Sequence, residues 1–159
     1  MPAPPVRAKF HPNINPAFNP NFNPRANASI SPICNFGVNP QRNTKISPAF
    51  NRSLDPLRTP ALNPTTNASL DPKQTESYSG LRRWTPESEL AGYIVNTPSK
   101  AVLLLFDQDL EWKAFAVDNL RQGYNIFNLE GAWNGFLLKN AAGGLNEFDL
   151  EGNWVGFIM

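Results

Sequence analysis

The sequence predicts an all-β chain in two parts: a rod of octapeptide repeats over residues 8–72, then a small antiparallel domain of β-hairpins over residues 85–159. Three observations predict it. Prolines recur every eight residues in the first part, a Trp-containing segment recurs every 21 residues in the second, and composition changes between them. Fourteen of the sixteen prolines precede residue 73, whereas all four tryptophans and nine of the ten glycines follow it. Residues 1–7 are then a tail, and 73–84 a joint.

The octads share the pattern P-x-x-N-x-x-[ILVF]-[NSD]. Prolines open the copies from Pro16 to Pro72, and residues 8–15 form a degenerate first copy. Self-similarity at a fixed period indicates a repeat architecture. In six of the seven copies that start at Pro16 to Pro64, an asparagine stands three places after the proline. These asparagines are Asn19, Asn27, Asn35, Asn43, Asn51 and Asn67.

Each octad is predicted to turn and to stack on its neighbours. Asn, Ser or Asp followed by proline favours a turn, and proline at this spacing excludes a continuous helix. At the third octad position, Phe18, Cys34 and Phe50 alternate with smaller or basic residues, which gives a second period of sixteen. We therefore expect a β-solenoid with two octads per coil and a ladder of stacked asparagines on its edge. A disordered linker and a polyproline-like rod are the alternatives.

The second part is predicted to be a meander of β-hairpins. Residues 127–138 and 148–159 match at a spacing of 21, and residues 106–117 are an eroded copy. Each copy carries one tryptophan after a turn: Trp112, Trp133 and Trp154. Equivalent positions predict a row on one face. The row forms either the core of the small domain, which its size favours, or an exposed platform for a sugar ring or a partner.

The turn segment "LEGAWNG" resembles the MORN repeat, a tandem β-hairpin whose units carry Glu-Gly-x-Trp and a nearby glycine. The resemblance covers two segments of about ten residues, and the second Gly-x-Gly element of that family is missing here. It implies a scaffold or membrane-associated interaction module.

Charge is divided unequally between the two parts. Residues 1–72 carry seven basic and two acidic side chains, a difference of +5, whereas residues 73–159 carry seven basic and eleven acidic ones, a difference of −4. Opposite charge favours contact between the halves, or between copies head to tail. The apolar strand that ends at Met159 is predicted to be an edge open to another chain.

Several functional classes are excluded by composition. Cys34 is the only cysteine and His11 the only histidine, so we expect no disulfide, no metal site and no Ser-His or Cys-His catalytic pair. Carboxylates recur at every hairpin turn, which is typical of polar turns rather than of a catalytic pair. No cofactor is expected, and no nucleic-acid motif or membrane span is present. The expected compartment is the cytoplasm, with non-classical export left open.

The sequence thus predicts a non-enzymatic structural or interaction protein. The first hypothesis is a self-assembling module or scaffold that contacts itself or another protein through the asparagine edge and the tryptophan row. The alternative is a carbohydrate-binding module that uses Trp112, Trp133 and Trp154.

Overall fold

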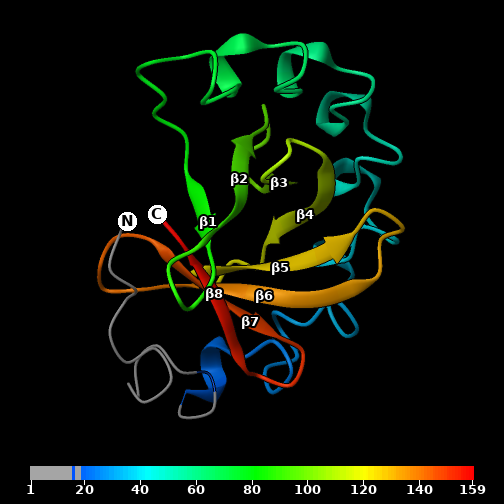
Figure 1. The fold of residues 1–159 in the computed structure, drawn as a ribbon. Helices are drawn as coiled ribbons and strands as arrows, with labels where there is room; N and C mark the ends of the chain where they lie inside the picture. The colour runs from blue at the N-terminus through cyan, green and yellow to red at the C-terminus, as the bar shows by residue number, and fades with distance from the viewer. Residues whose placement is uncertain (1–15, 17–18) are drawn as a thin grey trace.

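The computed structural model describes residue 16 and residues 19–159, which form a closed eight-stranded barrel and a belt of octads around it (Figure 1). The strands are β1 (Arg82–Trp84), β2 (Leu90–Asn96), β3 (Val102–Asp107), β4 (Trp112–Asp118), β5 (Gly123–Asn128), β6 (Trp133–Lys139), β7 (Leu145–Asp149) and β8 (Trp154–Ile158). Every strand pairs antiparallel with its neighbours in the chain, and β1 pairs with β8 to close the barrel. The prediction of an all-β chain with antiparallel hairpins is confirmed.

Four similar hairpins build the barrel. The pairs β1–β2, β3–β4, β5–β6 and β7–β8 each shift register by one residue beside their turn. A bulge of this kind bends a strand and increases its twist, which helps a sheet to close. The extra residues are Ala91, Lys113, Asn134 and Val155. The first hairpin is therefore a fourth copy of the unit, with Leu90 where the other copies carry tryptophan.

The barrel sheet is buried on both faces. One set of alternating strand residues fills the interior: Ile94, Leu103, Leu105, Ala114, Ala116, Ile126, Leu137, Leu145 and Ile158. The opposite set lies on the outside and is covered by the belt. Among its members, Phe115 stacks on Phe127 with ring centroids 5.5 Å apart, and Phe136 stacks on Phe148 at 5.4 Å.

Each octad consists of two consecutive turns. The second turn forms a short 3₁₀ helix in six octads: η1 (Pro20–Phe22), η2 (Phe36–Val38), η3 (Thr44–Ile46), η4 (Arg52–Leu54), η5 (Pro60–Leu62) and η6 (Ala68–Leu70). The side chain that precedes a turn accepts a hydrogen bond from the backbone N–H two residues later, as Asn39 does from Gln41 and Asn43 from Lys45. Short polar side chains are favoured at such positions because they satisfy an otherwise unpaired donor.

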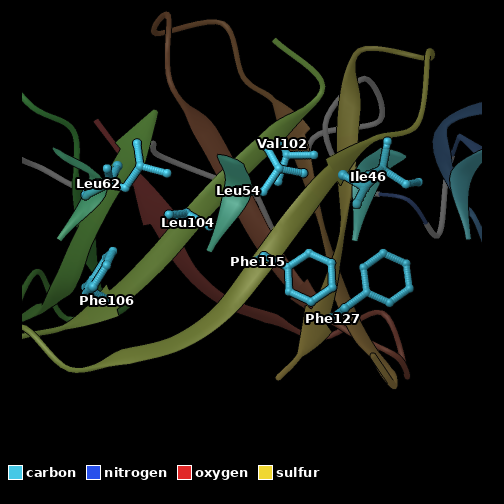
Figure 2. Close-up of a cluster of buried hydrophobic side chains, with 10 residues drawn as sticks. Ile46, Leu54, Leu62, Val102, Leu104, Phe106, Phe115 and Phe127 are labelled. Carbon is cyan, nitrogen blue, oxygen red and sulfur yellow. The ribbon is translucent and has the colours of Figure 1, made fainter. Parts of the chain in front are cut away.

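The octads wind around the outside of the barrel as a belt, which we define as residues 19–72. In Figure 1 their small loops run from blue through cyan to green along the outer side of the strands. The order is opposite to that of the strands: Phe22 packs near β6–β8, and Leu62 packs near β3. Figure 2 shows Ile46, Leu54 and Leu62 of the belt lying over the outward side chains of β3–β5.

The expected solenoid rod is therefore wrong. None of the described octad residues forms a strand, and each octad packs on the barrel instead of stacking on an octad below it. One aliphatic side chain per octad needs a partner for burial, and the outer face of the barrel supplies it. The period of sixteen concerns the third octad position, which is exposed in the described octads and faces away from the barrel.

The predicted open edge at the end of the chain is also wrong. Ile158 and Phe157 of β8 pair with Arg83 and Trp84 of β1. Met159 exchanges two further backbone hydrogen bonds with Arg82, at 2.9 and 3.1 Å. Closure removes the sheet edges that would template another strand. The eight strands of the barrel therefore leave no free edge to which a strand of another copy could add.

Candidate functional site

The four hairpin turns share one geometry. The residue that begins each turn accepts hydrogen bonds on its side chain, as Asp107 Oδ1 does from the N–H groups of Asp109 and Glu111, both at 2.9 Å. Asn128 and Asp149 make the same two bonds in their turns. Three places after these residues the backbone is left-handed, at Ser88, Leu110, Gly131 and Gly152. Each turn joins an odd-numbered strand to the next even-numbered strand of an antiparallel barrel, so the four turns lie at one end of the barrel, which we call the turn end.

The turn end is strongly acidic. The four turns span Thr85–Glu89, Asp107–Glu111, Asn128–Ala132 and Asp149–Asn153, and they hold eight of the thirteen acidic residues of the chain. Lys113 is a basic residue beside the β3–β4 turn. Its Nζ lies 2.9 Å from Glu111 Oε2 and 3.7 Å from Asp107 Oδ2. The hydrogen bond and the charge of Glu111, with Asp107 adding to them, raise the pKa of Lys113.

The three predicted tryptophans stand just after three of these turns. Trp112, Trp133 and Trp154 are the first residues of β4, β6 and β8, so they occupy alternate strands around the turn end. All three are half-buried. The indole N–H of Trp112 donates to Ala114 O at 2.9 Å, and that of Trp133 donates to Gly135 O at 2.8 Å. The half-buried indoles neither form a fully buried core nor stand fully exposed, so the glycan alternative stays a prediction.

The predicted asparagines link neighbouring octads at a period of eight. The side-chain N–H groups of Asn27, Asn35, Asn43, Asn51 and Asn67 donate to the carbonyl oxygen six residues earlier, at 2.7–3.0 Å. Asn19 precedes η1 and makes no capping hydrogen bond to it. These side chains are therefore occupied within the belt, where they hold the octads in register. They do not form an edge ladder.

The structure brings together a different set of residues, which sequence reasoning missed. Two adjoining recesses lie where the belt meets the turns β3–β4 and β5–β6, and they share Leu129. The larger one, of about 280 Å³, is lined by Leu57, Asn63, Thr65, Phe106, Leu110, Glu111 and Trp112 as well. The smaller one, of about 50 Å³, is lined by Pro40, Gln41, Ser47, Ala49, Phe50, Phe115, Glu130 and Gly131 as well. We call the two together the belt–turn groove.

Three exposed apolar side chains line this groove: Phe50, Leu57 and Leu129. Phe50 is 69% exposed and Leu57 is 73% exposed, and Leu129 lies between them on the turn. Glu111 and Glu130 place carboxylates at the rim. A contiguous apolar patch with a polar rim is typical of an interaction site. The groove is thus apolar in the middle and negatively charged at its margin.

A sequence signal for the groove did exist. Octad positions two and three are exposed in the described octads, and they mostly carry polar or small residues. Ile33, Phe50 and Leu57 break that rule with large apolar side chains. Such residues at positions that are not buried point to a surface that contacts something else.

Other kinds of site are not found among the described residues. No group of three or more His, Cys, Asp or Glu side chains in that part of the chain is placed to hold a metal ion. No helix there is long and apolar enough to cross a membrane. Comparison of the chain with models of protein families, with curated proteins and with solved structures gives no match. The likeness of the turn segments to MORN repeats therefore stays a resemblance.

Proposed function

We propose that this protein is a non-enzymatic interaction protein whose copies associate head to tail through the belt–turn groove. The observation that carries the proposal is the groove itself, where Phe50, Leu57 and Leu129 expose apolar surface around recesses rimmed by Glu111 and Glu130. Desolvated apolar anchors inside a polar rim supply most of the energy in protein interfaces.

Charge supports a second copy of the chain as the occupant. The turn end carries eight acidic residues, whereas the belt carries five basic residues against two acidic ones: Arg25, Arg42, Lys45, Arg52 and Arg58 against Asp55 and Asp71. The five basic residues are exposed. A basic belt of one copy that meets the acidic rim of another is electrostatically complementary, which raises the association rate and fixes the register.

The belt also offers an apolar knob for the groove. Ile33 and Phe36 are exposed, they line neither recess of the groove, and the Arg42 guanidinium lies 5.0 Å from the Phe36 ring centroid. An aromatic ring that carries a cation fits an apolar groove with a carboxylate rim. Because knob and groove are different surfaces, the contact is heterologous and propagates into a filament unless its rotation closes a ring.

The test is sedimentation velocity and electron microscopy across a concentration series. We expect the wild type to form species larger than a monomer, and we expect their fraction to fall at high salt because the rim contacts are screened. The groove variant Leu57→Glu and the knob variant Phe36→Glu are each expected to stay monomeric. The matched control is Leu120→Glu, which places the same charge at a position that is 79% exposed and outside the groove.

Mixing the two variants distinguishes a heterologous contact from a symmetric one. One Leu57→Glu chain and one Phe36→Glu chain still share one intact groove and one intact knob. The mixture should therefore form heterodimers and nothing larger. A wild type that stays monomeric at every concentration, or a Leu57→Glu variant that assembles like the control, contradicts the proposal.

A further inference from the structure

The two ends of the barrel differ in the side chains that lie there. At the turn end, the ion pair between Arg83 Nη2 and Glu147 Oε1, at 2.8 Å and mostly buried, lies in the barrel interior. The loops that join β2 to β3, β4 to β5 and β6 to β7 lie at the other end, which we call the mouth. In Figure 1 the β6–β7 loop, in orange, lies on the same side as the C-terminus. The mouths of β-barrels are common positions for small-ligand sites.

Two adjoining recesses open at the mouth. The larger has a volume of about 360 Å³ and is lined by Leu81, Tyr124, Lys139, Asn140, Gly143, Gly144, Leu145 and Ile158. The smaller, of about 190 Å³, is lined by Asp118, Leu120, Gln122, Gly123, Tyr124 and Lys139. Tyr124 and Lys139 belong to both, so they stand between the two lobes. The larger volume lies within the range of small-molecule pockets.

The larger lobe is apolar at its base, and two glycines form part of its side. Leu145 and Ile158 belong to the buried interior cluster, and Leu81 adds a partly exposed side chain. Gly144 cannot carry a side chain, because a Cβ there would lie 2.1 Å from Ile158 O. Gly143 has φ +85° and nothing within 4 Å of a Cβ position. Gly143 and Gly144 therefore add no side chain to the β6–β7 side of the recess, which Lys139, Asn140 and Leu145 line.

Two hydrogen-bond donors at the boundary of the lobes are free of partners among the described residues. Lys139 makes no ion pair there, and the Tyr124 hydroxyl makes no hydrogen bond there. Burial, with the nearby Asp118 carboxylate adding to it, raises the pKa of Tyr124, so its hydroxyl stays a donor at neutral pH. Asp118 itself accepts a hydrogen bond from Leu120 N at 2.7 Å.

We propose that the mouth binds a small apolar carboxylate, such as a medium-chain fatty acid. The hydrocarbon lies against Leu81, Leu145 and Ile158, and the carboxylate accepts hydrogen bonds from Lys139 Nζ and the Tyr124 hydroxyl. An apolar floor binds any hydrophobic molecule, but a charge-assisted pair with lysine selects an anion. This site lies at the end of the barrel opposite the belt–turn groove and does not depend on it.

The test is titration of the full chain with decanoate, and with decanol as the uncharged homologue, followed by calorimetry and by NMR. We expect the methyl signals of Leu81, Leu145 and Ile158 to shift. The indole N–H signals should stay unchanged, because Trp112, Trp133 and Trp154 stand at the turn end.

Variants separate the charge from the apolar floor. Lys139→Gln should weaken decanoate binding about tenfold while leaving decanol binding unchanged, because a charged hydrogen bond is lost. Lys100→Gln is the matched control: it removes the same charge from the exposed β2–β3 loop, which lines neither lobe. Leu81→Asn should weaken both ligands.

Three results overturn the proposal: absence of decanoate binding, equal weakening by Lys139→Gln and Lys100→Gln, or shifts that map to Leu57 and Leu129 instead of the mouth. Equal weakening shows non-specific attraction to charge. Shifts at the groove show that decanoate uses the apolar surface there.

Discussion

Asn125 donates a hydrogen bond from its Nδ2 to the carbonyl oxygen of Ile30, at 2.8 Å and across 95 positions of the chain. Asn125 lies on the outer face of β5 and is completely buried, and Ile30 is the inward aliphatic residue of its octad. The bond fixes the belt against the barrel within an interface that is otherwise largely apolar. Apolar contacts give this interface its strength, whereas the hydrogen bond gives it a register.

The first prediction concerns this bond. Asn125→Ala should lower the free energy of unfolding by about 1–3 kcal/mol, because it leaves a buried carbonyl oxygen without a donor. Urea unfolding measures the change, and hydrogen exchange should show faster exchange in the octads around residue 30. Asn134→Ala, at an exposed bulge position of β6, is the control and should have little effect. Equal stability of the two variants would show that the bond contributes nothing.

The second prediction tests whether the belt is part of the fold. Leu54 is fully buried between the belt and the barrel, whereas Leu57 in the next octad is 73% exposed. Leu54→Ala should lower the free energy of unfolding by about 2–5 kcal/mol. Leu57→Ala should change it by less than about 0.5 kcal/mol. A single cooperative transition in both variants would show that belt and barrel unfold together, and a separate early transition would show that they do not.

Much of the octad could be predicted, but not its partner. Local chemistry predicts three features of the octad: its period of eight, the turn that begins at the residue before each proline, and the single inward aliphatic residue. A sequence period shows which side chain of each octad is buried, but it does not show which part of the protein that side chain packs against. The sequence of the strands indicates what covers these side chains. Val102–Asp107 is apolar over five consecutive residues and is buried on both faces. A continuous apolar run predicts a sheet covered on both sides, and one cover is the belt.

The β1–β2 hairpin, which is the fourth copy of the unit, could not be recognised by comparing segments of the sequence, for a related reason. Its turn, Thr85–Glu89, has neither glycine nor the following tryptophan, yet Thr85 Oγ1 accepts a hydrogen bond from Glu89 N as the aspartate of other turns does. The β1–β2 turn therefore has the backbone geometry of the other three turns although its residues differ from theirs. The site residues escaped because Phe50, Leu57 and Leu129 are far apart in sequence and meet only after the belt has docked.

The third prediction concerns this divergent turn. Ser88 has φ 66° and a buried hydroxyl that finds no hydrogen-bond partner among the described residues. Gly152 occupies the equivalent position at φ +85°, with nothing within 4 Å of a Cβ. Ser88→Gly should therefore raise the free energy of unfolding by about 1 kcal/mol, and Gly152→Ala should lower it by a similar amount. Thermal unfolding measures both, and a Ser88→Gly variant less stable than the wild type contradicts the argument.

The fourth prediction concerns pH. Partial burial alone would raise the pKa of Asp149, but hydrogen bonds donated by Asn153 and by the backbone of Glu151 and Gly152 hold that pKa below its usual value. A carboxyl whose pKa is lowered in the folded state stabilises the fold above its unfolded pKa, about 3.9. That contribution disappears as the pH falls through the folded pKa.

Asp149→Asn should keep the turn, because Asn128 makes the same two hydrogen bonds in the neighbouring hairpin. The variant should melt below the wild type at about pH 6, and the gap should narrow as the pH falls through the lowered pKa of Asp149 in the folded state. Asn128→Asp is the reciprocal control: it should be more stable than the wild type at about pH 6 and should lose that advantage as the pH falls. A gap between Asp149→Asn and the wild type that stays constant from about pH 6 to pH 2.5 would show that the turn does not favour the charged form.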